Sequence, residues 1–256
     1  MKKMRLTLLV CFALLACVSV LVACTDTHVH AFGEWETVQE PTYTEDGVKS
    51  RCCSCGEKQS ENIKKLTPQT TMLSSLECKN ELQEVYNNSV VQKNLWYTED
   101  GVVYAIDVNG EHWIYYEAWG NEEDWNEAWC GNCDGEYYWF SKETTSSETS
   151  QIREKIPQDE VEEYDREIKA FGTKLFRNLA DTIAFVAKST DFECLKTIGE
   201  TTTYQIKLIV DDEVVNITIT VENGLITVFD GDNYVTATYT YDKVITLPDK
   251  ADYPLE

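Results

Sequence analysis

The sequence predicts an α+β fold in which one long helix covers an antiparallel sheet, with a small separate module in front of it. Residues 204–247 contain several stretches in which every second residue is apolar, a pattern typical of antiparallel strands with one covered face. Residues 158–188 carry apolar side chains at steps of three and four, which indicates an amphipathic helix. Residues 25–66 contain few apolar side chains, so they are expected to form a module of their own.

The first 23 residues have the pattern of a secretory signal peptide. Three basic residues lie within the first five, and residues 6–22 form an apolar run without a charge. This combination predicts export of the chain and removal of the segment. The predicted domains are therefore a signal peptide at 1–23, a small module at 24–66 and a main domain at 67–256.

The end of the apolar run, Leu21-Val22-Ala23-Cys24, resembles the lipobox of bacterial lipoproteins. The resemblance implies cleavage before Cys24, lipidation of Cys24, and anchoring at the extracytoplasmic face of the cell membrane. At about 0.8 kcal/mol per buried methylene, two or more acyl chains hold a protein on a membrane almost permanently. A poorer match ends at Cys17, and an uncleaved transmembrane helix is the alternative to cleavage.

The chain is strongly acidic, with a formal net charge of -23. Loss of the three basic residues of the signal segment makes the mature chain still more negative. A polyanion of this kind is excluded as a nucleic-acid binder. Anionic lipid headgroups also repel it, so the acyl anchor must hold it at the membrane.

The small module contains three motifs that together resemble a known repeat. Residues 30–35 read His-Ala-Phe-Gly-Glu-Trp, residues 41–47 read Pro-Thr-Tyr-Thr-Glu-Asp-Gly, and residues 51–56 read Arg-Cys-Cys-Ser-Cys-Gly. They resemble small repeats of surface proteins from Gram-positive bacteria, which look like zinc-ribbon sites built from one histidine and three cysteines. The resemblance implies a structural zinc as cofactor, with His30, Cys52 and Cys55 as ligands.

The chain departs from this repeat at Tyr43, where the pattern has a cysteine. His28 and Cys53 are the candidates for the fourth ligand. A Cys-x-x-Cys turn followed by glycine lets two thiolates hold one tetrahedral ion, and a module this short needs a metal or crosslinks. A disulfide or a metal-free remnant is the alternative. Residues 44–47 are predicted to form a hairpin turn with Gly47 in the left-handed conformation.

In the main domain the sequence predicts a short helix, a set of strands, the long helix and a closing meander. Asn109-Gly110 and Asn223-Gly224 are the strongest turn signals, because Asn and Gly tolerate the positive φ of two-residue hairpin turns. Residues 141–150 are polar and unpatterned, which indicates a loop. The expected elements are helices at 70–86 and 158–188 and strands at 101–108, 111–119, 136–140, 204–210, 215–221, 225–229, 234–241 and 244–247.

This order of elements resembles the half-barrel of the outer-membrane lipoprotein carriers (the LolA-like fold) and of its mycobacterial and Gram-positive lipoprotein relatives. The closing stretch from Asn223 to Pro248 also resembles the end of those proteins. The resemblance implies a long helix on the concave face of a curved sheet, an apolar cavity between helix and sheet, and no catalytic residue.

Five residues are the candidates for ligand binding. Six of the seven tryptophans lie between residues 96 and 139, and strand 111–119 is apolar on both faces, with Trp113, Tyr115 and Trp119 on one of them. The long helix is expected to turn Phe171 and Leu175 towards the same space. Exposed apolar patches usually mark binding sites; core packing is the alternative reading of the aromatic face.

Trp129-Cys130-Gly131-Asn132-Cys133 resembles a thioredoxin active site, which requires a helix that starts at the first cysteine. Here the motif is expected in a loop between strands among acidic residues, so redox catalysis is not predicted. Cys78 and Cys194 are candidates for a disulfide. The chain contains no Ser/His/Asp order, phosphate loop or His-Glu-x-x-His motif.

The predicted function is that of a membrane-anchored, non-enzymatic lipoprotein that binds a lipid or other apolar ligand or acts as a surface interaction module. One alternative is an adhesion protein or cell-wall glycan binder that uses the tryptophan-rich face. The other is a thiol oxidoreductase that uses Cys130 and Cys133. An open, helix-lined cavity favours a lipid, a flat exposed aromatic face favours a glycan, and a helix that begins at Cys130 favours redox chemistry.

Overall fold

The computed structural model describes residues 29–109, 112–189, 191–210, 213–232 and 234–255. The predicted signal segment, Cys24 and His28 lie outside the described residues. The chain divides into two compact units, Met1–Leu66 and Thr67–Glu256, and each is described by itself. Among the described residues, no helix combines the length and the apolar character needed to span a membrane.

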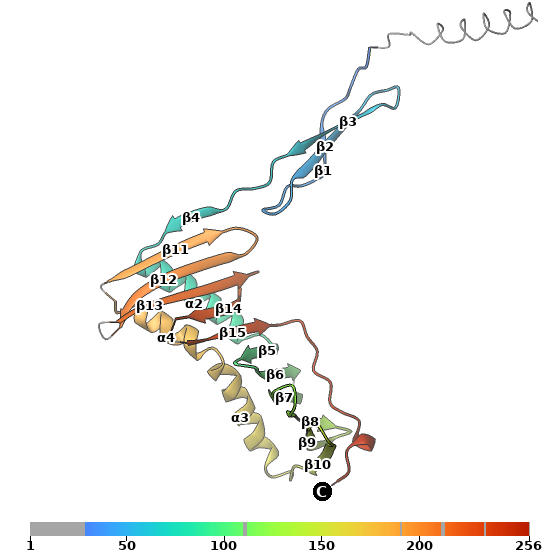
Figure 1. Ribbon diagram of the computed structural model, residues 1–256, viewed down its shortest axis with the longest axis vertical. Coiled ribbons are helices and arrows are strands. Elements are labelled where there is room, and N and C mark those ends of the chain that lie inside the picture. The colour runs from blue at the N-terminus through green and yellow to red at the C-terminus, as the bar shows by residue number, and fades with distance from the viewer. Residues whose placement is uncertain (1–28, 110–111, 190, 211–212, 233, 256) are drawn as a thin grey trace, which may run out of the picture. The chain divides into compact units, whose positions relative to one another are not determined.

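The first unit contains a three-stranded antiparallel sheet in the order β1-β2-β3 (Figure 1). Its strands are β1 (Glu36–Gln39), β2 (Gly47–Cys52) and β3 (Lys58–Ile63). All of β1 and nearly all of β3 are exposed. The main packing is a cation–π layer, in which Lys49 and Arg51 lie 4.8 and 4.5 Å from the centre of the Trp35 ring. The sheet therefore has almost no apolar core to stabilise it.

The prediction for Gly47 was wrong. It is the first, buried residue of β2, and it is not among the residues with positive φ. A Cβ atom at this position would lie 2.5 Å from the backbone nitrogen of Pro41 and 2.6 Å from the carbonyl oxygen of Gln39. The glycine is required by the close approach of two backbone segments, which a turn motif in the sequence does not reveal.

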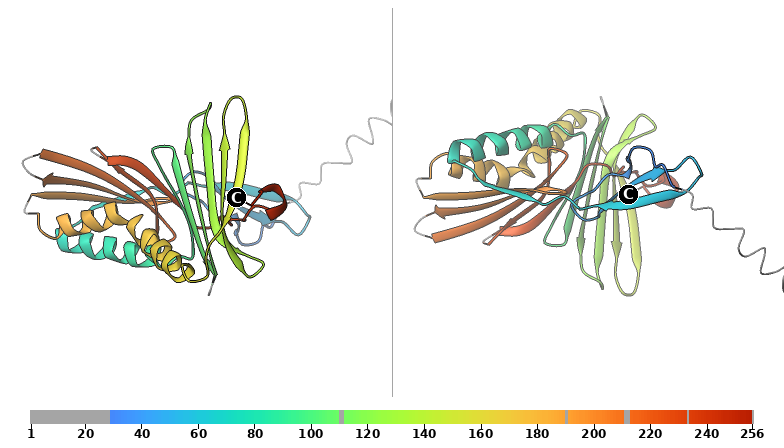
Figure 2. Two further views of the ribbon diagram at one scale, coloured as in Figure 1. Left: turned by 90° about the horizontal axis from the view of Figure 1, so that it is seen from below. Right: turned by 90° about the horizontal axis from the view of Figure 1, so that it is seen from above.

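The second unit is built on one twelve-stranded antiparallel sheet, curved and not closed (Figures 1 and 2). The strand order is β10-β9-β8-β7-β6-β5-β15-β14-β13-β12-β11-β4, so two meanders, β5–β10 and β11–β15, join through the pairing of β15 with β5. This confirms a sheet-dominated fold. The strands are β4 (Gln69–Met72), β5 (Asn94–Glu99), β6 (Val102–Asn109), β7 (His112–Gly120), β8 (Trp125–Cys133), β9 (Glu136–Thr144), β10 (Thr149–Lys155), β11 (Phe192–Ile198), β12 (Thr202–Val210), β13 (Glu213–Glu222), β14 (Leu225–Gly231) and β15 (Tyr234–Thr240).

The turn predictions were confirmed at two hairpins and wrong at a third place. Asn223 and Gly224 join β13 to β14 with φ values of 52° and 79°, as a two-residue turn of this type requires. The pairing of Asn109 with His112 confirms the hairpin between β6 and β7; Asn109 itself ends β6, and Gly110 lies outside the described residues. The expected loop at 141–150 is instead the end of β9, a tight turn and the start of β10. Its side chains are polar because they are mostly solvent-exposed.

Three helices cover one face of the sheet: α2 (Ser75–Val90), α3 (Val161–Lys174) and α4 (Arg177–Val186). Figure 2 shows α2 and α4 side by side against β11–β15, with α3 continuing towards β5–β7. The first helix starts later than expected, because residues 69–72 pair with β11 as strand β4. Ser74 then caps α2 in a capping box with Glu77.

The prediction of a single long helix at 158–188 was wrong, because the helix is interrupted at Leu175 and Phe176. The hydroxyl of Tyr239 donates a 3.0 Å hydrogen bond to the carbonyl oxygen of Leu175, which an unbroken helix would use internally. The amide of Phe176 donates to Thr173 in a tightened final turn of α3. The break lets α4 follow β11–β15 while α3 follows β5–β7.

The two faces of β7–β9 are both apolar because each has its own cover. On the helix side, Phe171 of α3 packs on Tyr104 and Tyr115, with ring centres 5.1 and 5.9 Å apart. On the other side, Tyr253 of the C-terminal segment packs on Phe140 and Trp129 at 5.5 and 6.2 Å. The guanidinium of Arg153 holds this segment by donating to the carbonyl of Lys250 at 2.7 Å.

We expect Ser74→Ala to lower the free energy of unfolding by about 1 kcal/mol, the usual loss for an N-cap serine. The hydrogen bonds from the Ser74 side chain and backbone hold the pKa of Glu77 below its usual value. A carboxyl group whose pKa is lower in the folded than in the unfolded state stabilises the fold at pH values above its unfolded pKa. This stabilisation is lost as the pH falls through the folded pKa. Denaturant unfolding should therefore show a smaller effect of the mutation in acid. Ser75→Ala, which removes no cap, is the control; an equal loss in both variants contradicts the assignment.

Candidate functional site

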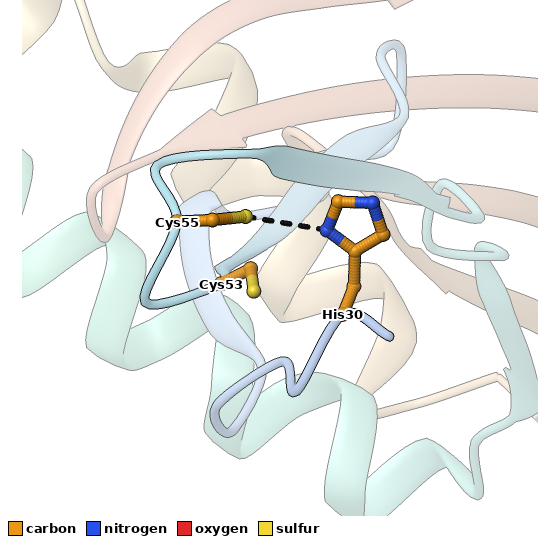
Figure 3. Close-up of side chains that lie close together, drawn as sticks. All are labelled: His30, Cys53 and Cys55. Carbon is orange, nitrogen blue, oxygen red and sulfur yellow. Dashed lines mark hydrogen bonds between the residues drawn. The ribbon is translucent and has the colours of Figure 1, made fainter. Parts of the chain in front are cut away.

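One histidine and two cysteines of the first unit form a group that could hold a metal ion (Figure 3). One ligand atom from each of His30, Cys53 and Cys55 lies within 4.8 Å of the other two. Nδ1 of His30 lies 3.2 Å from Sγ of Cys55. Figure 3 shows His30 on the segment before β1 and both cysteines on the connection between β2 and β3, with all three side chains converging.

The local backbone folds into a knuckle that brings these thiols together. The amide of Cys53 donates to the carbonyl of Glu57 at 2.8 Å, and the amide of Gly56 donates to the carbonyl of Cys53 at 2.9 Å. Gly56 has a φ of 93°, which favours glycine. Cys53 also pairs with Phe32 in an isolated antiparallel bridge, which brings the segment that carries His30 beside the knuckle.

The imidazole of His30 is oriented by a carboxylate on its far side. Its Nε2 atom lies 3.1 Å from Glu57 Oε2, while Nδ1 faces Cys55. Metal-bound histidines commonly donate their second ring N–H to a carboxylate in this way, which fixes the ring and its tautomer. A backbone hydrogen bond at Glu57 lowers the pKa of the Cys55 thiol, but its contact with Cys53 and partial desolvation raise that pKa above its usual value.

The structure brings together Cys53 and Cys55, and not the predicted pair of Cys52 and Cys55. Cys52 is the last residue of β2 and is exposed, whereas Cys53 is 4% exposed. Successive residues of a strand point to opposite faces, so only one of the two neighbours can face His30. Tyr43 is not part of the group, and His28, the other predicted ligand, lies outside the described residues.

A second candidate site is an apolar pocket of about 400 Å³ in the main unit, beneath α3. It lies where the end of α2, strands β5 and β6, and α3 meet. Ile168 and Phe176 form the helix side, and Leu95, Ile106 and Val108 form the sheet side. The remaining lining residues are Val90, Val91, Gln92, Lys93, Lys169, Gly172 and Thr173.

Gly172 sets the distance between α3 and the sheet at this pocket. A Cβ atom on Gly172 would lie 3.2 Å from Cδ1 of Ile106, closer than ordinary contact. The glycine weakens the helix by about 1 kcal/mol relative to alanine, but it allows α3 to approach β6. A smaller pocket of about 260 Å³ lies on the other flank of the same helix region, lined in part by Tyr104, Phe171 and Leu175.

The five predicted ligand-binding residues do not form one surface. Trp113 is 2% exposed and packs on Tyr137 with ring centres 5.2 Å apart, and Tyr115 packs on Phe171. These aromatic side chains belong to the core under α3. Trp119 is 40% exposed near the end of β7 and does not extend this cluster. Phe171 and Leu175 line the smaller pocket, so they are the members of the set that lie at a cavity.

The expected loop position of the Trp-Cys-Gly-Asn-Cys motif was wrong, because the whole motif lies in strand β8. Cys130 is fully buried opposite Tyr115, and burial raises the pKa of its thiol to about 12. Cys133 is three residues further along the strand, so it faces the opposite side of the sheet, where it packs with the C-terminal segment. No helix begins at Cys130.

The chain matches no protein-family model, and no curated protein or solved structure is significantly similar to it. Function is therefore argued from the two sites themselves. Sequence reasoning missed Glu57 and the residues from Val90 to Lys93. No sequence pattern identifies Glu57 as a partner of His30, because an acidic residue beside a knuckle is common. The pocket residues come from three distant segments that meet only in the folded chain.

We expect no disulfide reductase activity from Cys130 and Cys133. Two side chains on opposite faces of a strand cannot form the internal disulfide that such catalysis requires. The measurement is an insulin-reduction assay with Cys130→Ser as the control. Activity that is present in the wild type and lost in Cys130→Ser contradicts this expectation.

Proposed function

We propose that this chain is a non-enzymatic lipoprotein, anchored by Cys24 at the extracytoplasmic face of the cell membrane, whose main unit binds an apolar ligand beneath α3. The observation that carries the proposal is the pocket of about 400 Å³ between α3 and strands β5 and β6. Ligand sites are usually concave, mostly apolar and of 300–1,000 Å³, with a few polar groups at the rim. The volume of this pocket lies in that range, its interior is mostly apolar, and its polar groups lie at the rim.

The architecture around the pocket supports this proposal. The neighbouring core is tightly filled: Trp113, Phe176 and Leu179 are each at most 2% exposed. The space between the end of α2 and Ile106 is left unfilled, because α2 ends at Val90 before it can cover β6. Cavities walled by aliphatic side chains stay dry and accept apolar guests. The pocket is thus suited to an acyl chain or a molecule of similar shape.

We propose that the first unit holds a structural zinc ion through Nδ1 of His30 and the thiolates of Cys53 and Cys55. The donor set fits zinc, because soft thiolates and imidazole are the ligands of structural zinc sites. The carboxylate of Glu57 supports the imidazole. Bound zinc would supply a crosslink between the segment before β1 and the knuckle after β2. This unit needs such a crosslink, because its strands bury so little.

We expect Thr173→Trp to reduce uptake of an uncharged fluorescent lipid while leaving the thermal midpoint nearly unchanged. Thr173 is exposed at the rim of the pocket, so a large ring can enter the pocket without displacing core atoms. Ala170→Trp, an exposed position on α3 that does not line the pocket, is the matched control. Fluorescence titration decides the matter. Equal uptake by the wild type and both variants contradicts binding in this pocket.

We expect about one zinc ion per chain, retained by Cys52→Ser and lost from Cys53→Ser and Cys55→Ser. The reason is that only Cys53 and Cys55 face His30. Metal analysis of the purified proteins tests the assignment. If the wild type and all three variants lack zinc, the metal proposal is contradicted. Loss from Cys52→Ser and Cys55→Ser, with zinc retained by Cys53→Ser, returns the site to the ligands predicted from sequence.

We expect Cys24→Ser to abolish incorporation of labelled fatty acid and to block maturation, because no other thiol follows the apolar run at the lipobox position. Metabolic labelling followed by gel electrophoresis is the measurement, with Cys17→Ser as the control. Labelling that persists in Cys24→Ser and disappears in Cys17→Ser identifies Cys17 as the acceptor and contradicts the proposal.

A further inference from the structure

The two pockets that flank α3 differ in charge from the other pockets described in this acidic chain. The pocket beneath α3 is lined by two basic residues, Lys93 and Lys169, and by no acidic one. The smaller pocket on the other flank has two basic residues and one acidic residue in its lining. The three other pockets described in the main unit have more acidic than basic lining residues. In a chain of net charge -23, an excess of positive charge at the two pockets that flank α3 is a local exception.

Lys93 is the more informative of the two lysines. Its backbone carbonyl accepts a 2.9 Å hydrogen bond from the amide of Val108, which fixes it beside the sheet wall of the pocket. Among the described residues its ammonium takes part in no salt bridge, whereas Lys169 is paired with Asp165 at 2.8 Å. The rim of the pocket therefore carries one positive charge that no carboxylate neutralises.

We infer that the ligand beneath α3 is an anionic amphiphile, with its apolar chain in the pocket and a carboxylate or phosphate head at Lys93 and Lys169. The inference rests on the proposed function and names its ligand class. A charged head near low-dielectric protein requires a partner of opposite charge. The overall negative charge repels small free anions, so the apolar chain is needed for binding.

The test uses the full chain and three compounds with the same twelve-carbon tail: dodecanoate, dodecyl phosphate and dodecanol. Each is titrated below its micellar concentration against an uncharged fluorescent lipid bound to the protein. We expect one or both anionic compounds to displace the probe at about three- to tenfold lower concentration than dodecanol. Lys93→Gln combined with Lys169→Gln should remove this preference, and Lys207→Gln, an exposed lysine away from the pocket, should keep it. Inorganic phosphate alone should displace nothing.

The outcomes separate the two proposals. Displacement by only one anion supports the inference and identifies the head as carboxylate or phosphate. Equal displacement by dodecanol and both anions overturns the inference while the pocket remains a lipid site. A preference that survives the double lysine substitution also overturns it. Failure of the uncharged probe to bind the wild type overturns the proposed function itself.

A second inference comes from two cysteines elsewhere in the main unit. Cys78 of α2 and Cys194 of β11 are both fully buried as free thiols, and they belong to the same core cluster. The neighbouring backbone is held in register, since the amide of Leu73 donates to the carbonyl of Cys194 at 2.9 Å. We propose that these thiols form a disulfide in the exported protein. The two thiols lose two protons and two electrons to an external disulfide, which is released as two thiols.

This bond would join α2 to the sheet across a long loop, which restricts the unfolded chain. Non-reducing peptide mapping of the purified full chain should find Cys78 linked to Cys194. Reductant present during unfolding should lower the thermal midpoint of the wild type and leave that of the Cys78→Ala, Cys194→Ala double variant unchanged. Alkylation of both Cys78 and Cys194 in the unfolded, unreduced protein overturns the proposal, as does a link from either cysteine to another partner.

Discussion

The main unit depends on one requirement: the apolar face of a sheet that does not close must be covered by something other than the sheet itself. A closed barrel buries its own inner face, but here β10 and β4 lie at opposite ends of the strand order. Three helices provide the cover. At about 25 cal/mol per Å² of apolar surface removed from water, this contact is the main stabilising term of the unit. The pocket beneath α3 is the part of the face that the helices leave uncovered.

The break between α3 and α4 follows from the same requirement. Neighbouring strands of a sheet are rotated relative to one another, so a straight helix cannot follow both meanders. The carbonyl of Leu175 is left without a helical partner, and Tyr239 of β15 supplies the hydrogen bond that it needs. Because β15 is the strand that joins the two meanders, the break in the helix lies over the junction in the sheet. The pocket beneath α3 and the smaller pocket flank this break.

The sequence predicted those parts of the fold that depend on neighbouring residues, such as strands and turns. Alternation identified β12 to β15, and Asn223-Gly224 placed one of their turns. The strand expected at 244–247 was wrong, because these residues form no strand. The break at Leu175 was not predictable, since its cause is a hydroxyl 64 residues away in the sequence. The choice of Cys53 over Cys52 depends on which of two adjacent residues faces the segment of His30, and the bridge to Phe32 decides that. The aromatic face of Trp113 and Tyr115 suggested a binding surface, but α3 covers it, and Phe171 packs on Tyr115.

The central claim is that the space beneath α3 holds an apolar ligand. Native mass spectrometry of the purified full-length protein tests this most directly, with a denaturing measurement of the same sample to separate covalently attached groups from bound molecules. The account predicts an additional mass in the native spectrum that is lost on denaturation, is extracted into organic solvent, and is absent from Thr173→Trp. Identical native and denatured masses once zinc is subtracted, or an additional mass that Thr173→Trp retains in full, would contradict the account.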